Sequence, residues 1–164
     1  CMEAIRTRYG IEIEVFFPDA TRVESMVRRH GMNLFYDSIE NRKLCCGVRK
    51  VEPLKRALRG LDCWMTGLRR EQAVTRNQAQ KVEMDGEHGN IVKLNPLADW
   101  TARQIWDYIR QHKVPYNRLH DRGYPSIGCA PCTRAVQAVE DSRAGRWWWE
   151  DGETRECGLH VKSA

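Results

Sequence analysis

Apolar and polar residues alternate over residues 11–17, where isoleucine, valine and phenylalanine fall on one face and two glutamates on the other. A period of two is typical of a half-buried strand, and a Pro-Asp pair ends the run. After it the apolar spacing changes to three and four, in a segment that opens with a Thr21–Glu24 capping box and stops before Gly31. The pattern therefore predicts a strand over 11–17 and a helix over about 21–30.

The next segment, residues 38–58, has helical spacing that Gly47 and Pro53 interrupt. Glycine and proline inside a helical pattern bend or end a helix, so the adjacent thiols Cys45-Cys46 are predicted to lie near a helix break. A short apolar run over residues 61–66 then predicts a strand. Cys63 lies inside that run and is expected in the core.

The second half of the chain repeats the alternation of strands and helices. Residues 81–85 and 91–94 predict two short strands on either side of a turn, in which His88 is expected to be solvated. Residues 101–112 form an amphipathic helical pattern with its own capping box. The alternation favours an α/β fold: an open, mostly parallel three-layer sheet with an irregular C-terminal extension, in a single domain over residues 1–164.

Composition narrows the classes of protein that fit. Apolar residues make up 41% of the chain, enough for one core. The 27 basic and 22 acidic residues give a net charge of +5, with no block of like charge that would indicate a nucleic-acid-binding arm. No apolar run reaches the length of a bilayer and no leader is visible, so we expect a cytoplasmic protein. Because residue 1 is Cys1 rather than Met, we also expect an N-terminal truncation.

The seven cysteines comprise an adjacent pair, a Cys-x-x-Cys pair at Cys129 and Cys132, and three single residues. This odd set does not resemble a secreted disulfide framework. Adjacent thiols suit a [4Fe–4S] cluster better than a zinc ion, whose ligand pairs are usually two to four residues apart. A cluster on the two pairs is therefore favoured, while a zinc site, or buried thiols without metal, stays open.

The single Cys157 near the C-terminus is the candidate for a reactive thiol. Its neighbour Glu156 would raise the pKa of the thiol, so activation would have to come from cations or from His160. We expect residues 150–164 to form a mobile arm that carries this nucleophile. The alternative is an exposed thiol without a role.

Seven motifs, taken together, give the chain a resemblance to a known family. They are Cys45-Cys46-x-x-Arg49-Lys50, Thr66-Gly67-Leu68-Arg69-Arg70-x-Gln72, Lys93-Leu94-Asn95-Pro96-Leu97, Pro115-Tyr116-Asn117, Gly128-Cys129-x-x-Cys132-Thr133-Arg134, Arg146-Trp147-Trp148-Trp149-Glu150 and Glu156-Cys157-Gly158-Leu159-His160. The chain resembles the assimilatory adenylyl-sulfate (APS) reductases, relatives of the 3′-phosphoadenylyl-sulfate (PAPS) reductases. The family's phosphate-binding Ser-Gly-Gly loop has no counterpart, which again indicates truncation.

The resemblance implies an adenine-nucleotide α-hydrolase-like fold and the reduction of APS to sulfite and AMP in sulfate assimilation and cysteine biosynthesis. It implies thioredoxin as the reductant and an S-sulfocysteine intermediate on Cys157. The implied [4Fe–4S] ligands are Cys45, Cys46, Cys129 and Cys132. The implied substrate-binding residues are Lys50, Gly67, Arg76, Arg143, Arg146 and His160.

Other functions stay open on the sequence. The double thiol pair favours APS, with PAPS as the alternative substrate. An RNA sulfur-transfer protein of a related fold would share the cluster thiols, but the chain shows no RNA-binding module and no concentrated basic stripe. A zinc-stapled interaction domain is the non-enzymatic alternative, and a homo-oligomer is compatible with all of these.

Overall fold

The computed structural model describes residues 1–150, which form two compact units. The sheet unit consists of Cys1–Glu14, Cys63–Met84 and Val92–Trp148. The helical unit consists of Val15–Asp62, Asp85–Ile91 and, among the described residues, Trp149 and Glu150. Because the chain passes repeatedly from one unit to the other, neither unit is a continuous piece of sequence. The single domain over residues 1–164 stays a prediction.

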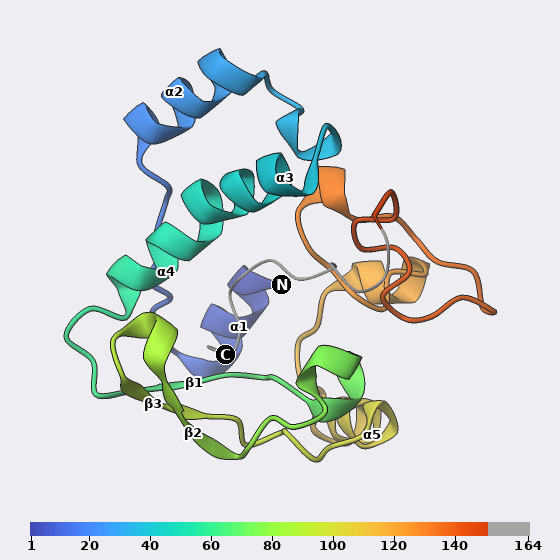
Figure 1. Cartoon of the computed structure of the whole chain (residues 1–164). Coiled ribbons are helices and arrows are strands. Elements are labelled where there is room, and N and C mark those ends of the chain that lie inside the picture. Colours follow the sequence, from blue (N-terminus) through green and yellow to red (C-terminus); the bar gives the residue numbers. More distant parts are fainter. Residues whose placement is uncertain (151–164) are drawn as a thin grey trace. The chain divides into compact units, whose positions relative to one another are not determined.

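The sheet unit is built on three short strands, which Figure 1 draws side by side in the order β1-β3-β2. These are β1 (Cys63–Met65), β2 (Val82–Asp85) and β3 (Ile91–Leu94). β1 and β3 run parallel, with Trp64 opposite Lys93. The three strands confirm the predictions for residues 61–66, 81–85 and 91–94, and the parallel pair together with the helices confirms the α/β class.

Two helices accompany the sheet in this unit, α1 (Met2–Tyr9) and α5 (Ala102–His112). The predicted capping box of α5 is present: the Thr101 hydroxyl accepts from the Gln104 amide, and the Gln104 side chain accepts from the Thr101 amide. At the other end of α5, the Arg8 guanidinium donates to the last carbonyl oxygens, at 2.6 and 2.7 Å. A cation at a helix C-terminus satisfies acceptors that the helix itself leaves unpaired.

The helical unit contains α2 (Ala20–His30), α3 (Ile39–Cys46) and α4 (Glu52–Ala57). The helix predicted over 21–30 is confirmed, but its cap is Asp19, whose carboxylate accepts from the Arg22 amide at 2.9 Å. The predicted Thr21–Glu24 box is therefore wrong. An aspartate two residues earlier satisfies the same orphan donors, so the helix begins sooner.

The predicted break after the adjacent thiols is a widened turn. Residues Gly47–Val51 form a π-helical segment (η2) between α3 and α4, and Figure 1 shows the coil continuing through it. Pro53 lies in the first turn of α4, a position where proline is tolerated. Short 3₁₀ turns complete the described elements: Leu34–Tyr36, Arg70–Gln72, Val74–Arg76, Gly86–His88, Arg118–Arg122 and Ala130–Cys132.

Three local expectations are wrong. Residues 11–17 form no strand, and Phe17 is 75% exposed, because alternation gives a strand only where a neighbour takes up its backbone hydrogen bonds. Cys63 is exposed rather than in the core, since in β1 the inward position falls to Trp64. The His88 side chain is buried instead of solvated, because its Nδ1 forms a hydrogen bond with the Asp85 carboxylate at 2.9 Å.

A buried polar network joins the ends of β2 and β3. The Glu83 carboxylate accepts from the Lys93 ammonium at 3.0 Å and from the Asn95 amide at 3.2 Å. Burial by itself would raise the pKa of Glu83, but these donors hold that pKa below its usual value. None of the helices between residues 1 and 150 has the length and apolarity needed to cross a bilayer.

This network makes the stability of the protein dependent on pH. Because the folded pKa of Glu83 is depressed, its stabilisation is complete above the unfolded value of about 4.3 and is lost as pH falls through the folded pKa. At neutral pH we expect Glu83→Gln to lower the free energy of unfolding by about 1–3 kcal/mol, since it leaves Lys93 without its anion. The difference from wild type should shrink towards about pH 3 in urea titrations. Glu12→Gln, at an exposed position, is the control, and a difference that stays constant with pH would contradict the assignment.

Candidate functional site

The carboxyl ends of β1 and β3 meet in a hydrogen-bonded turn. Thr66 follows β1 and Asn95 follows β3; the Thr66 hydroxyl donates to the Asn95 side-chain oxygen, and the Leu68 amide donates to the Thr66 hydroxyl at 3.2 Å. Asn95 is fully buried and also donates to the Gln80 carbonyl at 2.8 Å. Ligands of open α/β sheets bind beyond the carboxyl ends of the strands, and this turn lies at that position.

Two predicted substrate residues belong to this edge of the sheet unit. Gly67 directly follows Thr66 and is exposed. Arg76 ends a 3₁₀ turn, and its guanidinium donates to the Gln72 side chain at 2.8 Å. The same Gln72 oxygen accepts from the Arg69 amide at 3.2 Å, so the loop after β1 and the Arg76 side chain are fixed together.

The Cys-x-x-Cys pair lies on a second loop of the sheet unit. Cys129 caps the 3₁₀ turn Ala130–Cys132, and the Cys132 amide donates to the Cys129 carbonyl at 2.9 Å. Thr133 tightens the loop by donating its hydroxyl to the same carbonyl, at 2.9 Å, and accepting from the Gly128 amide at 3.1 Å. Cys132 is buried and Cys129 half-buried. Both thiols therefore belong to one rigid turn.

Arg146 packs directly against this thiol loop. It pairs with Thr133 in an isolated antiparallel bridge, and the amide of the next residue, Trp147, donates to the Cys132 carbonyl at 3.2 Å. The Arg146 guanidinium donates to the Ile127 carbonyl at 3.2 Å and lies 4.4 Å from the centroid of the Trp147 ring. The structure thus brings a buried arginine together with one thiol pair.

Arg143 lies on the turn that delivers Arg146. Its backbone amide is held by the Asp141 carboxylate at 2.8 Å, and its carbonyl accepts from the Arg146 amide at 2.8 Å. Arg143 is half-buried. This turn therefore presents two arginines from one short segment.

The other thiol pair belongs to the helical unit, at the end of α3. Cys45 is half-buried and Cys46 buried, and the π-helical segment that begins at Gly47 carries Lys50, also half-buried. π-helical turns are uncommon and often occur at functional sites. The sequence predicted a helix break at this point. In the structure a π-helical turn follows the thiols and contains Lys50.

Next to Cys46 lies an ion pair that the sequence did not reveal. The Arg42 guanidinium donates two parallel bonds to the Glu150 carboxylate, at 2.7 and 2.8 Å, with the two side chains 0% and 3% exposed. Burial by itself would lower the pKa of Arg42, but Glu150 and the neighbouring Cys46 raise it. The available signal was that Arg42 lies four residues before Cys46, on the same face of the helix.

The two thiol pairs offer a metal donor set that is divided between the units. Among residues 1–150, no three His, Cys, Asp or Glu side chains come together in an arrangement that could hold a metal ion. Each unit contributes one pair of thiols, one buried and one half-buried. Neither pair alone supplies the four donors of a tetrahedral zinc site or the four thiolates of a cluster.

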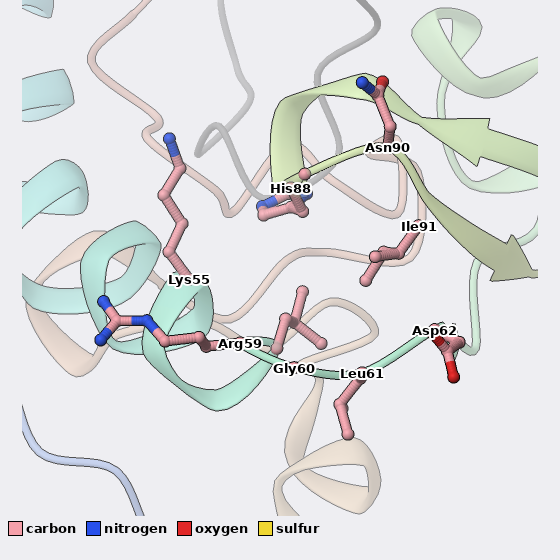
Figure 2. Close-up of a pocket in the computed structure, with 10 residues that line it drawn as sticks. Lys55, Arg59, Gly60, Leu61, Asp62, His88, Asn90 and Ile91 are labelled. Carbon is pink, nitrogen blue, oxygen red and sulfur yellow. The ribbon is translucent and has the colours of Figure 1, made fainter.

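A separate cleft of about 540 Å³ lies within the helical unit. Figure 2 shows its lining, which comes from the end of α4 and from the turn between β2 and β3, with Lys55, Arg59 and His88 among the residues. No thiol of residues 1–150 lines it, and its residues lie before β1 and at the start of β3 rather than after these strands. We therefore do not assign the thiol chemistry to this cleft.

Several predicted features lie outside the described residues. These are Cys157, His160 and the arm over residues 150–164 beyond Glu150. Their assignments stay predictions.

Comparison with known proteins identifies the family. The family profile described as the phosphoadenosine phosphosulfate reductase domain matches residues 1–135. The chain belongs to this family. The adenosine 5′-phosphosulfate reductase of Burkholderia cepacia is 56% identical over 160 residues, which are 98% of this chain and 64% of that protein. The enzyme of the same name from Rhizobium tropici is 49% identical over 160 residues, covering 98% of this chain and 88% of the relative.

A solved member of the family supports the fold. The crystal structure of PAPS reductase from Candida auris, as a phosphate complex, is 31% identical with a TM-score of 0.64, and the match covers 82% of this chain and 63% of that one. The chain thus spans under two thirds of that protein and of the Burkholderia relative. The resemblance to the APS reductase family drawn from the motifs is confirmed.

The turn that carries the two arginines depends on a glycine. A Cβ on Gly145 would collide with the backbone carbonyl of Arg134, and the Gly145 carbonyl accepts from the Arg134 amide at 2.9 Å. Backbone cannot yield as a side chain can, so we expect Gly145→Ala to lower the free energy of unfolding by about 1–3 kcal/mol. Urea denaturation followed by tryptophan fluorescence measures it.

Gly47→Ala provides the matched control. A Cβ at Gly47 meets nothing within 4 Å, and its φ of −57° is helical. We expect this variant to be neutral or slightly more stable. Equal stability of the two variants would show that the close approach at Gly145 does not constrain the turn.

Proposed function

We propose that the full-length protein reduces APS to sulfite and AMP with electrons from a thioredoxin-like dithiol, in the cytoplasm, as a step of sulfate assimilation. The observation that carries the proposal is the double thiol pair, Cys45-Cys46 with Cys129 and Cys132, in a chain 56% identical to an APS reductase. The buried Arg146 beside one pair and the turn beyond β1 and β3 support it.

The substrate needs a cationic site because negatively charged oxygens surround its sulfur. A thiolate can approach only where cations offset that charge and hold the phosphate that leaves. Arg143 and Arg146 on one turn, Arg76 at the edge of the sheet and Lys50 on the π-helical segment are the cations that we assign to this task. Gly67 lets the chain approach the nucleotide closely, since it has no side chain.

The chemistry consists of three successive displacements at sulfur. The Cys157 thiolate attacks the sulfur of APS, an S–S bond forms, the S–O bond to phosphate breaks, and AMP leaves with the electron pair. A dithiol thiolate then attacks the Cys157 sulfur, sulfite leaves, and the second thiol of the dithiol releases Cys157 as a thiolate. The dithiol is oxidised to a disulfide and supplies both electrons. We assign His160 to the substrate site, where it would assist in activating the Cys157 thiol.

We assign a [4Fe–4S] cluster to Cys45, Cys46, Cys129 and Cys132. When bound, it would supply a structural link and a local electrostatic field, because the dithiol already accounts for both electrons. One thiol pair belongs to each unit, so a cluster on all four thiols requires both units. The same double pair is our reason for preferring APS to PAPS.

Iron content tests the ligand set. We expect anaerobically prepared full-length protein to hold about four irons per chain. Serine at any one of the four ligand positions should lower the iron and acid-labile sulfide content. Cys63→Ser, on the exposed face of β1, should retain both. A single zinc ion without sulfide would contradict the assignment and favour the zinc-stapled alternative.

The covalent intermediate tests the reaction itself. Full-length protein incubated with APS and no reductant should release one AMP per active chain and gain a sulfonate on Cys157, measured by chromatography and mass spectrometry. Cys157→Ser should keep its iron and show neither event. Undiminished sulfite formation by Cys157→Ser would overturn the mechanism, and salt-dependent tRNA binding without sulfite release would favour RNA sulfur transfer.

A further inference from the structure

We propose that a largely buried series of hydrogen-bonded side chains positions the exposed turn at Gly67 to receive the nucleoside part of the substrate. The proposal rests on the function proposed above and adds positioning residues to its nucleotide site. The series, which we call the Asn95 network, consists of Lys93, Glu83, Asn95 and Thr66. All four residues belong to the sheet unit.

The Asn95 amide fixes the direction of the hydrogen bonds around it. Its NH₂ group donates to the Gln80 carbonyl at 2.8 Å and to the Glu83 carboxylate at 3.2 Å, so its side-chain oxygen faces Thr66. The Thr66 hydroxyl donates its only proton to that oxygen and keeps its lone pairs for the Leu68 amide, at 3.2 Å. Because Asn95 is 0% exposed, each of these bonds also offsets the cost of burying a polar group.

The network holds the residues on both sides of Gly67. Thr66, before it, also donates its backbone amide to the Leu94 carbonyl at 2.8 Å, and Leu68, after it, is buried. Gly67 itself is exposed and is therefore the apex of a turn with buried flanks. A turn anchored on each side is preorganised, so a ligand that binds to it loses little free energy in ordering it.

Backbone bonds extend the same bracing to the loop beyond the turn. The Arg70 amide donates to the Ala98 carbonyl at 2.9 Å, and the Ala98 amide donates to the Asn95 carbonyl at 3.0 Å. Asn95 thus connects the loop after β1 to the loop after β3 through both its side chain and its backbone.

Nothing among residues 1–150 requires a glycine at position 67. Its φ lies outside the left-handed region, and a Cβ there would meet nothing within 4 Å. An uncovered backbone beyond the carboxyl ends of parallel strands is a surface that a ligand can approach closely. The charges of Lys93 and Glu83 offset each other within the network, at 3.0 Å. The turn is therefore suited to the uncharged nucleoside, while the arginines assigned above bind the charged groups.

Removing one hydroxyl tests the network. In the full-length protein, Thr66→Val keeps the shape of the side chain but removes the donor to Asn95 and the acceptor for the Leu68 amide. We expect the Kd for AMP, measured by calorimetry, and the KM for APS to rise about tenfold, while turnover at saturating APS stays within about twofold of wild type, because the contact serves bound substrate and transition state equally. Thr66→Ser restores the hydroxyl and should return both constants to within about twofold of wild type.

Thr101→Val is the matched control in the same unit. The Thr101 hydroxyl also accepts from a backbone amide, that of Gln104 at 3.2 Å, but at an exposed position at the start of α5. This variant loses a helix cap, and with it stability, yet should bind AMP like the wild type. Wild-type affinity for AMP in Thr66→Val would overturn the network, and so would an equal loss of affinity in Thr66→Ser or Thr101→Val.

A methyl group at the apex tests whether the nucleotide reaches the turn. Because a Cβ at Gly67 meets nothing within 4 Å, we expect Gly67→Ala to unfold at the wild-type urea concentration or a slightly higher one. It should nevertheless bind AMP about tenfold more weakly, since the methyl group would collide with a closely bound ligand. Wild-type affinity in this variant would overturn the placement of the nucleoside at the turn.

Hydrogen exchange tests the network without any nucleotide. The Leu68 amide should exchange roughly tenfold faster in Thr66→Val, while the amides of α5 keep their wild-type rates; unchanged exchange at Leu68 would overturn the network. A full-length protein that binds AMP with the expected variant effects yet forms no sulfite from APS would overturn the proposed reduction alone. Should Thr66→Val fail to fold, Thr66→Ala replaces it in each measurement, because it removes the same hydroxyl without placing a methyl group against the polar atoms of Asn95.

Discussion

A buried charge must be matched by an opposite charge at hydrogen-bonding distance, and the Arg42–Glu150 pair is the clearest case of that constraint in this protein. It joins α3 to a residue 108 positions later in the chain. The Arg42 guanidinium interacts with Cys46 of the adjacent-thiol pair, and Trp149, the residue before Glu150, has its ring centroid 6.4 Å from that of Phe35. Removing either member would leave an uncompensated charge inside the protein.

The chemistry that we assign draws on both units of the chain. The sheet unit supplies Gly67, Arg76, Arg143, Arg146 and the Cys129–Cys132 turn, while the helical unit supplies Lys50 and the adjacent thiols. Neither unit by itself holds a complete set of cluster ligands or of cations. The two units alternate along the sequence, so no single cut in the chain would separate one from the other.

Local patterns were sufficient to predict the parts of the fold whose causes are local. The capping box of α5 depends on residues three positions apart, and it is present as predicted. The alternation over residues 11–17 failed because a strand also requires a partner, which a sequence pattern does not specify. Spacing likewise identified the thiol pairs, but not Asn95, His88 or Arg42, whose burial depends on residues brought close by folding.

The π-helical segment after the adjacent thiols behaves as an α-helix with one residue too many. In a regular α-helix each residue turns the chain by about 100°, so an extra residue rotates everything beyond it by that amount relative to everything before it. Arg42 and Cys46 can therefore face one set of neighbours while Pro53 and Leu58 are buried among others, along a coil that never breaks. The length of Gly47–Val51 therefore determines how the residues after it are rotated about the helix axis relative to those before it. Deleting one residue there would turn the whole apolar face of the following helix to another direction without altering any side chain outside the segment.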